Sequence, residues 1–111
     1  CPGAIYNACG KYNINQSASL VRQADSIISH DTGLMHIAAA FKKDIISIWG
    51  NTIPQFGMTP YLPTGKGSSI TIEVQDLNCR PCSKLGFNQC PKKHFNCMNL
   101  IDNQEIINAI N

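Results

Sequence analysis

Apolar residues recur along the first half of the chain with two alternating periods, one typical of strands and one typical of helices. The pattern predicts strands near residues 4–6 and over residues 26–29 and 44–49, the second of them buried. Helices are predicted on either side of residues 26–29, the first ending near Ala24 and the other beginning after residues 31–33. Because a single helix joins the last two strands, we expect them to be parallel with a right-handed crossover, as in an α/β fold.

Cap residues and apolar spacing locate the two helices more closely. Asn15 and Ser17 are candidate N-caps of the first helix. In the second helix, Met35 and residues 38–40 are interpreted as packing residues. The stripe expected to face the sheet follows the spacing i, i+3, i+4 and i+7 and consists of Leu34, Ile37, Ala38 and Phe41.

The second half of the chain is less regular. Residues 52–69 are rich in proline and glycine without a sustained period, which predicts a long loop of the kind that often carries function. Residues 70–74 alternate between apolar and polar side chains, as in a strand. A cysteine-rich segment follows, and Asp102 with Glu105 three residues later predicts the capped start of a last helix.

Composition and charge narrow the class of protein. Charged residues make up 14% of the chain, well below the roughly 25% of an ordinary soluble domain. The net charge of +2 is too weak a field to favour nucleic acid as a partner. No apolar run approaches the roughly 18 residues of a transmembrane segment, and the N-terminus carries no secretion signal. Since the sequence begins with Cys1 rather than Met, the chain is interpreted as a piece of a longer cytoplasmic protein.

The sharpest local pattern lies at residues 29–36, where polar residues and a glycine join a strand to a helix. The first N–H groups of a helix are unpaired and its macrodipole is positive there, so an anion such as a diphosphate binds at this end. Thr32 adds a hydroxyl donor, and Gly33 lets a ligand approach the backbone closely. The ring of His36 can reach the same place from one turn further on. Asp31 offers an acceptor that suits sugar hydroxyls.

The same residues also fit a purely structural interpretation. Asp31 or Thr32 would then be the helix cap, Gly33 a turn residue, and His36 a side chain paired with a neighbouring carbonyl group. His30, at the end of a strand, fits a structural role better than a ligand-binding one. Spacing alone does not decide between binding and capping.

Residues 31–40, followed by residues 45–52 and Pro54, resemble the C-terminal signature of glycosyltransferase family nine, the heptosyltransferases of lipopolysaccharide core synthesis. The family pattern is Asp-Ser/Thr-Gly-x-x-His-x-Ala-Ala-Ala, then a strand and a Gly-Pro/Asn-Thr loop. The helix over residues 18–25 and the Cys97-Met98 pair match as well, so the resemblance covers about residues 10–105.

This resemblance implies a Rossmann-like parallel sheet with flanking helices, in the C-terminal domain of a GT-B type glycosyltransferase. Residues 1–111 would then be an incomplete domain that binds the nucleotide-sugar donor, and the N-terminal acceptor domain would lie outside the chain. The family's general base, a phosphate-binding Lys and a ribose-binding acidic residue are expected upstream. We therefore expect no catalytic residue in this chain and no activity from it alone.

The family pattern also assigns roles by position. It implies that Asp31 contacts the donor sugar, while Thr32, Gly33 and Leu34 present backbone and hydroxyl donors to the diphosphate. His36 lies beside them. Thr52 belongs to a loop that faces the cleft in the family and is a further candidate contact.

The cysteines are a separate question. Cys79, Cys82, Cys90 and Cys97 could close a tetrahedral zinc site, because the first two have the C-x2-C spacing of zinc ligands. The second pair is separated by six residues, which departs from zinc-ribbon spacing, and the resemblance implies no metal and no cofactor. Free thiols or adventitious disulfides are the favoured interpretation.

The predicted function is transfer of heptose or a related sugar from a nucleotide diphosphate donor, which the resemblance implies to be ADP-heptose. The implied acceptor is the lipopolysaccharide core or lipid A, and the implied reaction is inverting and metal-independent. We expect the enzyme in the cytoplasm, with peripheral association at the inner face of the inner membrane. Two alternatives stay open: a non-catalytic nucleotide-binding module and a zinc-stabilised interaction domain built on residues 79–98.

Overall fold

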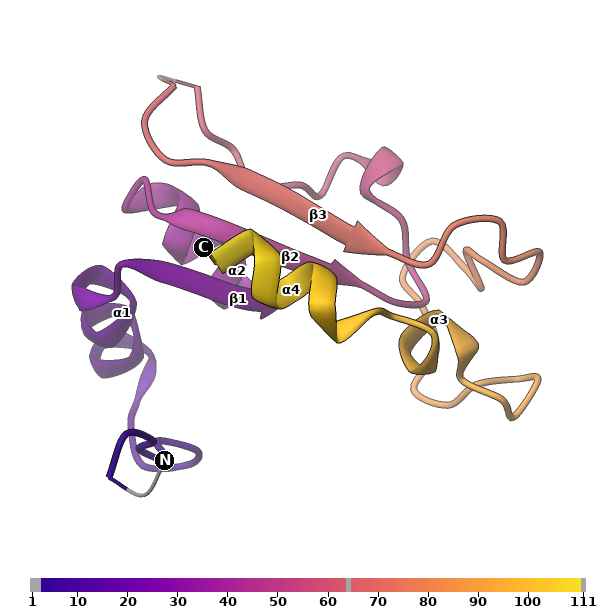
Figure 1. Cartoon of the computed structure of the whole chain (residues 1–111), viewed down its shortest axis with the longest axis horizontal. Coiled ribbons are helices and arrows are strands. Elements are labelled where there is room, and N and C mark those ends of the chain that lie inside the picture. The colour runs from indigo at the N-terminus through magenta and orange to yellow at the C-terminus, as the bar shows by residue number, and fades with distance from the viewer. Residues whose placement is uncertain (1–2, 64, 111) are drawn as a thin grey trace.

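A computed structural model describes residues 3–63 and 65–110, so Cys1, Pro2, Thr64 and Asn111 lie outside the described residues. The chain folds into short helices and strands with long connections after β2 and β3 (Figure 1). In chain order these are α1 (Ile14–Gln23), β1 (Ser26–His30), α2 (Gly33–Ala40), β2 (Asp44–Trp49), a 3-10 turn (Pro54–Phe56), β3 (Ser69–Glu73), α3 (Asn96–Asn99) and α4 (Asn103–Ile110).

The three described strands form one parallel sheet in the order β1-β2-β3. Ile28 pairs with Ile46 across the first ladder, and Ile46 pairs with Ile70 across the second. In Figure 1, α2 lies behind this sheet and α4 lies in front of it. The parallel β1-α2-β2 unit and the flanking helices confirm the predicted α/β class and fit a Rossmann-like domain.

The core lies between the sheet and the first two helices. Trp49 and Met35 are fully buried and belong to one cluster of buried residues. The cluster consists of Val21, Met35, Ala38, Ala39, Ile45 and Trp49. Residues 45–49 form a strand whose side chains are buried or half-buried on both faces of the sheet, as in the central strand of a parallel sheet.

The stripe predicted for α2 was wrong at both ends. Leu34 is 39% exposed and Phe41 is 40% exposed, while Met35, Ala38 and Ala39 are the buried residues of the helix. The helix ends at Ala40, so Phe41 is the C-cap and not part of the face that packs on the sheet. Of the residues interpreted as packing, Met35 and the first two alanines are confirmed, whereas Ala40 is exposed.

Three further predictions near the N-terminal half need correction. No strand forms at residues 4–6, which are exposed and have no paired strand beside them. The N-cap of α1 is Asn13, not Asn15 or Ser17, because Asn13 Oδ1 accepts the Gln16 N–H at 2.9 Å and Gln16 Oε1 accepts the Asn13 N–H at 3.0 Å. The first paired strand, β1, is not buried: it is an edge strand whose residues alternate between exposed and half-buried.

Long loops gather at the carboxyl ends of the strands, where the arrowheads in Figure 1 point. The cysteine-rich segment and α3 lie at this end of the sheet. The chain then returns through α4, which begins after Asp102 as predicted: Asp102 Oδ1 accepts the Gln104 N–H at 2.8 Å, although the bond is to Gln104 and not to Glu105. Among the described residues, no helix is both long and apolar enough to cross a membrane.

Candidate functional site

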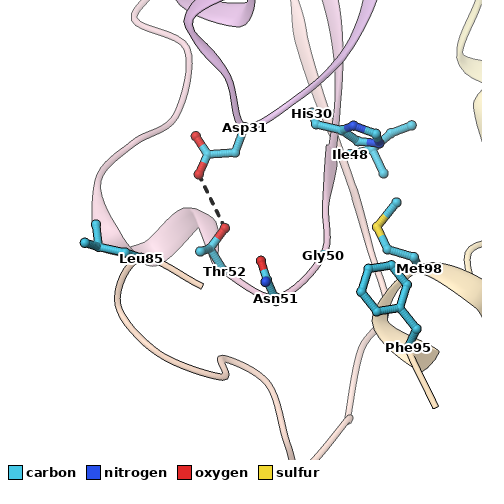
Figure 2. A pocket seen from close by; sticks show the side chains of 9 residues that line it. All are labelled: His30, Asp31, Ile48, Gly50, Asn51, Thr52, Leu85, Phe95 and Met98. Atoms are coloured by element: carbon cyan, nitrogen blue, oxygen red, sulfur yellow. Dashed lines mark hydrogen bonds between the residues drawn. The ribbon is translucent and has the colours of Figure 1, made fainter. Parts of the chain in front are cut away.

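A cavity of about 290 Å³ opens at the carboxyl ends of β1 and β2 (Figure 2). Its lining comes from three parts of the chain: the end of β1, the end of β2 with the loop that follows it, and the cysteine-rich segment. The lining residues are His30, Asp31, Ile48, Gly50, Asn51, Thr52, Leu85, Phe95 and Met98. Ligands of open α/β sheets bind at this edge of the sheet, which makes the cavity the candidate site.

Asp31 and Thr52 form the polar centre of the cavity. Thr52 Oγ1 donates to Asp31 Oδ2 at 3.3 Å, across the gap between the ends of β1 and β2 (Figure 2). The bond orients one carboxylate oxygen, Oδ2. The other oxygen, Oδ1, can accept a hydrogen bond from a hydroxyl group of a ligand. The fold therefore brings together Asp31, the predicted sugar contact, and Thr52, the further candidate contact.

The start of α2 lies directly after Asp31. Thr32 is the N-cap residue, yet its side chain makes no capping bond with the helix and shares a hydrogen bond with Ser29 Oγ at 3.2 Å. The structural interpretation is therefore confirmed only in that Thr32 is the N-cap residue: its side chain bonds Ser29 and that of Asp31 bonds Thr52, so neither forms the expected capping bond. The first turn of α2 keeps its positive end available to an anion.

The surroundings of Gly33 leave space for a ligand at the start of α2. A Cβ atom at Gly33 would meet no atom within 4 Å, and the residue does not have the positive φ that favours glycine. Neither backbone conformation nor internal packing therefore requires glycine at this position. The absence of a side chain leaves the backbone open to close approach by a ligand.

The predicted residues form two adjacent groups rather than one. Asp31 and Thr52 line the cavity, whereas Thr32, Gly33, Leu34 and His36 are exposed along the start of α2 and do not line it. Because Asp31 immediately precedes Thr32, the two groups meet at that point. The geometry suits a ligand with an anionic part over the helix and a neutral, hydroxyl-rich part in the cavity.

An apolar wall of the cavity was missed by the sequence analysis. Phe95 and Met98 face the cavity beside His30, and Leu85 lies opposite them (Figure 2). Met98 packs closely on Gly50, where an added Cβ would lie 2.9 Å from the Met98 Sδ. The only sequence feature that pointed here was the match of Cys97-Met98 to the family pattern. His30, which fitted a structural role better, also lines the cavity.

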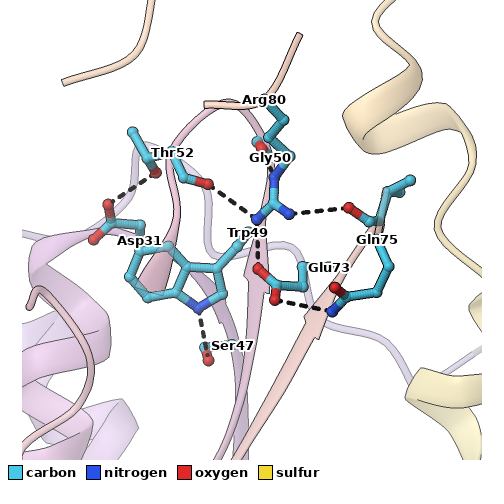
Figure 3. Close-up of polar contacts among 9 residues, drawn as sticks. Asp31, Ser47, Trp49, Gly50, Thr52, Glu73, Gln75 and Arg80 are labelled. Carbon is cyan, nitrogen blue, oxygen red and sulfur yellow. Dashed lines mark hydrogen bonds and ion pairs between the residues drawn. The ribbon is translucent and has the colours of Figure 1, made fainter. Parts of the chain in front are cut away.

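Arg80 was missed as well. Its guanidinium lies beside the loop that carries Gly50 and Thr52, and it is paired with Glu73 at 2.6 Å (Figure 3). The side chains of Arg80 and Glu73 are only 7% and 12% exposed. No sequence pattern identifies Arg80 as a residue of the site, because it lies between two cysteines in a segment without periodicity.

The cysteines that the structure describes are free thiols, and only Cys97 among the four clustered ones is buried. Cys79 Sγ lies 3.8 Å from His94 Nε2. Within residues 3–63 and 65–110, no three His, Cys, Asp or Glu side chains are placed to hold a metal ion.

The thiols differ in acidity. Hydrogen bonds from backbone N–H groups, above all that of Phe95, lower the pKa of Cys90. Burial raises the pKa of Cys97, with smaller contributions from the neighbouring thiols Cys82 and Cys90. At a given pH below these pKa values, Cys90 therefore carries the larger thiolate fraction.

Iodoacetamide near neutral pH is expected to alkylate Cys90 before Cys97, because the thiolate is the reactive form and Cys97 is both buried and less acidic. Raising the pH through the pKa of Cys97 should narrow the difference in rate. Peptide mapping by mass spectrometry over a time course measures both rates in one sample. Faster modification of Cys97 in the folded protein would contradict the order.

Comparison with known proteins gives a consistent result. Residues 1–93 match the profile of glycosyltransferase family 9 (heptosyltransferase). The lipooligosaccharide heptosyltransferase 2 of Haemophilus influenzae is 40% identical over 80 residues, which are 72% of this chain and 22% of that protein. The lipooligosaccharide heptosyltransferase 2 of Campylobacter jejuni serotype O:6 is 29% identical over 106 residues, 96% of this chain and 31% of that protein.

Shorter matches include the lipopolysaccharide heptosyltransferase 2 of Escherichia coli, 32% identical over 50 residues, 45% of this chain and 14% of that protein. No solved structure is significantly similar to the chain. The chain thus spans less than a third of the length of each of these relatives. Its match to the family profile covers most of its length, and on that ground the chain belongs to glycosyltransferase family 9, the heptosyltransferase family.

Proposed function

We propose that this chain is the donor-binding part of a longer, two-domain GT-B type enzyme that transfers heptose, or a related sugar, to a lipopolysaccharide core or lipid A acceptor. ADP-heptose is the proposed donor. The names of the relatives support the reaction, and the two adjacent halves of the site support the type of donor. Residues 1–111 would form an incomplete C-terminal domain, with the N-terminal acceptor domain and the general base upstream. We place the enzyme in the cytoplasm, peripheral to the inner membrane.

The donor diphosphate lies at the start of α2 in this proposal, and the sugar lies in the cavity. Backbone N–H groups of the first turn and the Thr32 hydroxyl bind the phosphate oxygens, with Leu34 and His36 beside them. Asp31 Oδ1 accepts a sugar hydroxyl, while Thr52 holds Oδ2. Phe95 and Met98 cover the apolar side of the cavity.

Transfer proceeds by direct displacement with inversion. The acceptor oxygen forms a bond to the anomeric carbon as the bond from that carbon to the phosphate oxygen breaks, and the nucleoside diphosphate leaves with the electron pair. The acceptor proton passes to the upstream general base. The N-terminus of α2 stabilises the negative charge that builds on the leaving diphosphate, a role that needs no metal in this scheme.

Gly33 is the observation that carries the proposal. It has no steric or conformational reason to be glycine within the fold, and it lies at the first position of a helix whose N-cap side chain does not cap it. A diphosphate held against the backbone accounts for both facts.

The first test is calorimetric titration of the full-length protein with ADP, using UDP and GDP as controls. Thr32→Val removes one hydroxyl donor to a charged group, so the Kd for ADP is expected to rise about tenfold. Binding of UDP or GDP in place of ADP would keep the transferase and change the donor. Unchanged ADP affinity in the variant would contradict the placement of the diphosphate.

Gly33→Ala is a matched variant in the same titration. Alanine at the first helical position does not strain α2, so thermal stability should be unchanged or slightly higher. The added methyl group would occupy the space assigned to the phosphate, and ADP affinity should fall.

The same titration separates the two alternative functions. A non-catalytic nucleotide-binding module would bind ADP with the same affinity, and the sugar would not change that affinity. A zinc-stabilised interaction domain would bind no nucleotide and would unfold when a chelator is added.

A further inference from the structure

Arg80 ties together the carboxyl ends of two parallel strands. Its Nε donates to Gly50 O at 2.6 Å, Nη2 donates to Thr52 O at 3.0 Å, and Nη1 donates to Val74 O at 3.0 Å (Figure 3). Nη2 also pairs with Glu73 Oε2 at 2.6 Å. Gly50 and Thr52 follow β2, while Glu73 and Val74 lie at the end of β3.

The burial of this charge shows that its position is fixed. A guanidinium that is 7% exposed is stable only when it is paired and hydrogen-bonded, and Glu73 supplies the opposite charge. Gln75 Nε2 donates to the other oxygen of that carboxylate at 3.0 Å. The planar fork of arginine matches acceptors in several directions at once, which the single ammonium of lysine does not.

The cysteine-rich segment fixes the same loop at a second point. Cys82 N–H donates to Asn51 O at 3.0 Å, so the carbonyl groups of residues 50, 51 and 52 all accept bonds from residues 80–82. Asn51 Nδ2 donates to Phe87 O at 2.8 Å. Gly86 approaches the Asn51 side chain so closely, with φ +78°, that a Cβ there would lie 2.6 Å from Asn51 Oδ1. The backbone of the loop therefore has little freedom.

The fixed loop presents Thr52 to Asp31. Thr52 O is held by Arg80 on one side, and Thr52 Oγ1 donates to Asp31 Oδ2 at 3.3 Å on the other. Arg80 does not line the cavity that contains Asp31, so it acts on the carboxylate only through the loop. A shift of the loop would break or lengthen the bond that orients Asp31.

We propose that Arg80 is a positioning residue for the donor sugar: it holds residues 50–52 so that Thr52 orients the Asp31 carboxylate. This inference rests on the proposed function and extends it to a residue that touches no substrate. Since misplacement of a reacting group by about 1 Å can lower a rate by about 100-fold, a loosened loop should affect transfer more than nucleotide binding.

Arg80→Lys in the full-length protein tests the proposal. Lysine keeps the charge opposite Glu73 and loses the fork, so kcat/KM for transfer from the nucleoside diphosphate sugar should fall about tenfold or more. The Kd for ADP should stay at the wild-type value, because the diphosphate is assigned to α2 and not to residues 50–52. Arg22→Lys is the matched control: Arg22 is exposed on α1, and its replacement should change neither quantity.

A double-mutant cycle with Thr52→Val separates positioning from a merely structural role. If Arg80 acts through Thr52, the double variant should transfer no more slowly than Thr52→Val alone. Multiplied losses, or equal losses of ADP binding and transfer in Arg80→Lys, would overturn the proposal.

Thr52→Val provides a second test of the proposal if Arg80→Lys does not fold. Wild-type transfer by Thr52→Val would overturn the proposal, and a tenfold loss with unchanged ADP affinity would support it. Failure of the wild-type protein to transfer sugar from any nucleoside diphosphate donor would contradict the proposed function itself. An active wild-type protein with independent effects of the two variants would contradict only the role of Arg80.

Discussion

Replacing Asp31 by alanine is expected to lower kcat/KM for sugar transfer by the full-length protein about 10- to 100-fold. A hydrogen bond to a charged group contributes about 1.5 to 3 kcal/mol, and about 1.4 kcal/mol corresponds to a factor of ten in rate. Asp31 is the carboxylate of the cavity, and Thr52 holds one of its oxygens. Initial rates at varied donor concentration measure the effect.

Asp44→Ala is the matched control for this prediction. Asp44 begins β2 at the opposite end of the sheet, where its Oδ1 accepts the Ser68 N–H at 2.9 Å and the Ser68 hydroxyl at 3.0 Å. The control therefore also removes a hydrogen-bonded carboxylate, and it should leave transfer near the wild-type rate. Wild-type activity in a folded Asp31→Ala variant would remove Asp31 from the site.

Replacing Trp49 by alanine is expected to have the largest effect on stability, a loss of about 3 to 5 kcal/mol in the free energy of unfolding. Trp49 is fully buried in the core cluster between β2 and the first two helices. Its Nε1 also donates to Ser47 Oγ at 3.0 Å, so alanine leaves a cavity and takes a donor from a buried hydroxyl. Denaturant unfolding followed by circular dichroism gives the difference.

Two variants with smaller expected effects serve as controls for Trp49→Ala. Trp49→Phe keeps a buried aromatic ring but loses the hydrogen bond and leaves a smaller void, so it should cost less than Trp49→Ala. Ile28→Ala removes a side chain that is 48% exposed and should cost less still. A Trp49→Ala variant as stable as the wild type would mean that the cluster is not the core of the longer protein.

The elements of the sheet could be predicted from the sequence because their apolar runs are short and bounded by turn residues. The strands over residues 26–30, 44–49 and 69–73 lie within one residue of the predicted ranges 26–29, 44–49 and 70–74. The orientation of α2 could not be predicted as well, because nearly all its side chains are apolar and several stripes fit. Alanine at positions 38 and 39 allows close packing on the sheet, and this selects the stripe that contains Met35.

The residues of the candidate site also divide into those that the sequence could place and those that it could not. The sequence could place Asp31, Thr32, Gly33 and Thr52 at one edge of the sheet, because each lies in a local motif next to a predicted strand end; their roles in binding stay predictions. Arg80 and Phe95 could not, since their roles depend on which loop the cysteine-rich segment packs against. Gly50, which accepts the Arg80 bond, lies 30 positions before Arg80. Asp31, which lines the same cavity as Phe95, lies 64 positions before it, and local spacing does not record such distant neighbours.

The open edge of the sheet has a practical consequence. β1 pairs with β2 on one side, and no described strand covers its other side. A free strand edge is a template for pairing with a second molecule. The half-exposed Ile28 adds apolar surface that such pairing would bury. Copies of the 111-residue chain are therefore expected to associate along β1, which sets an upper limit on the concentration at which this chain can be studied in solution.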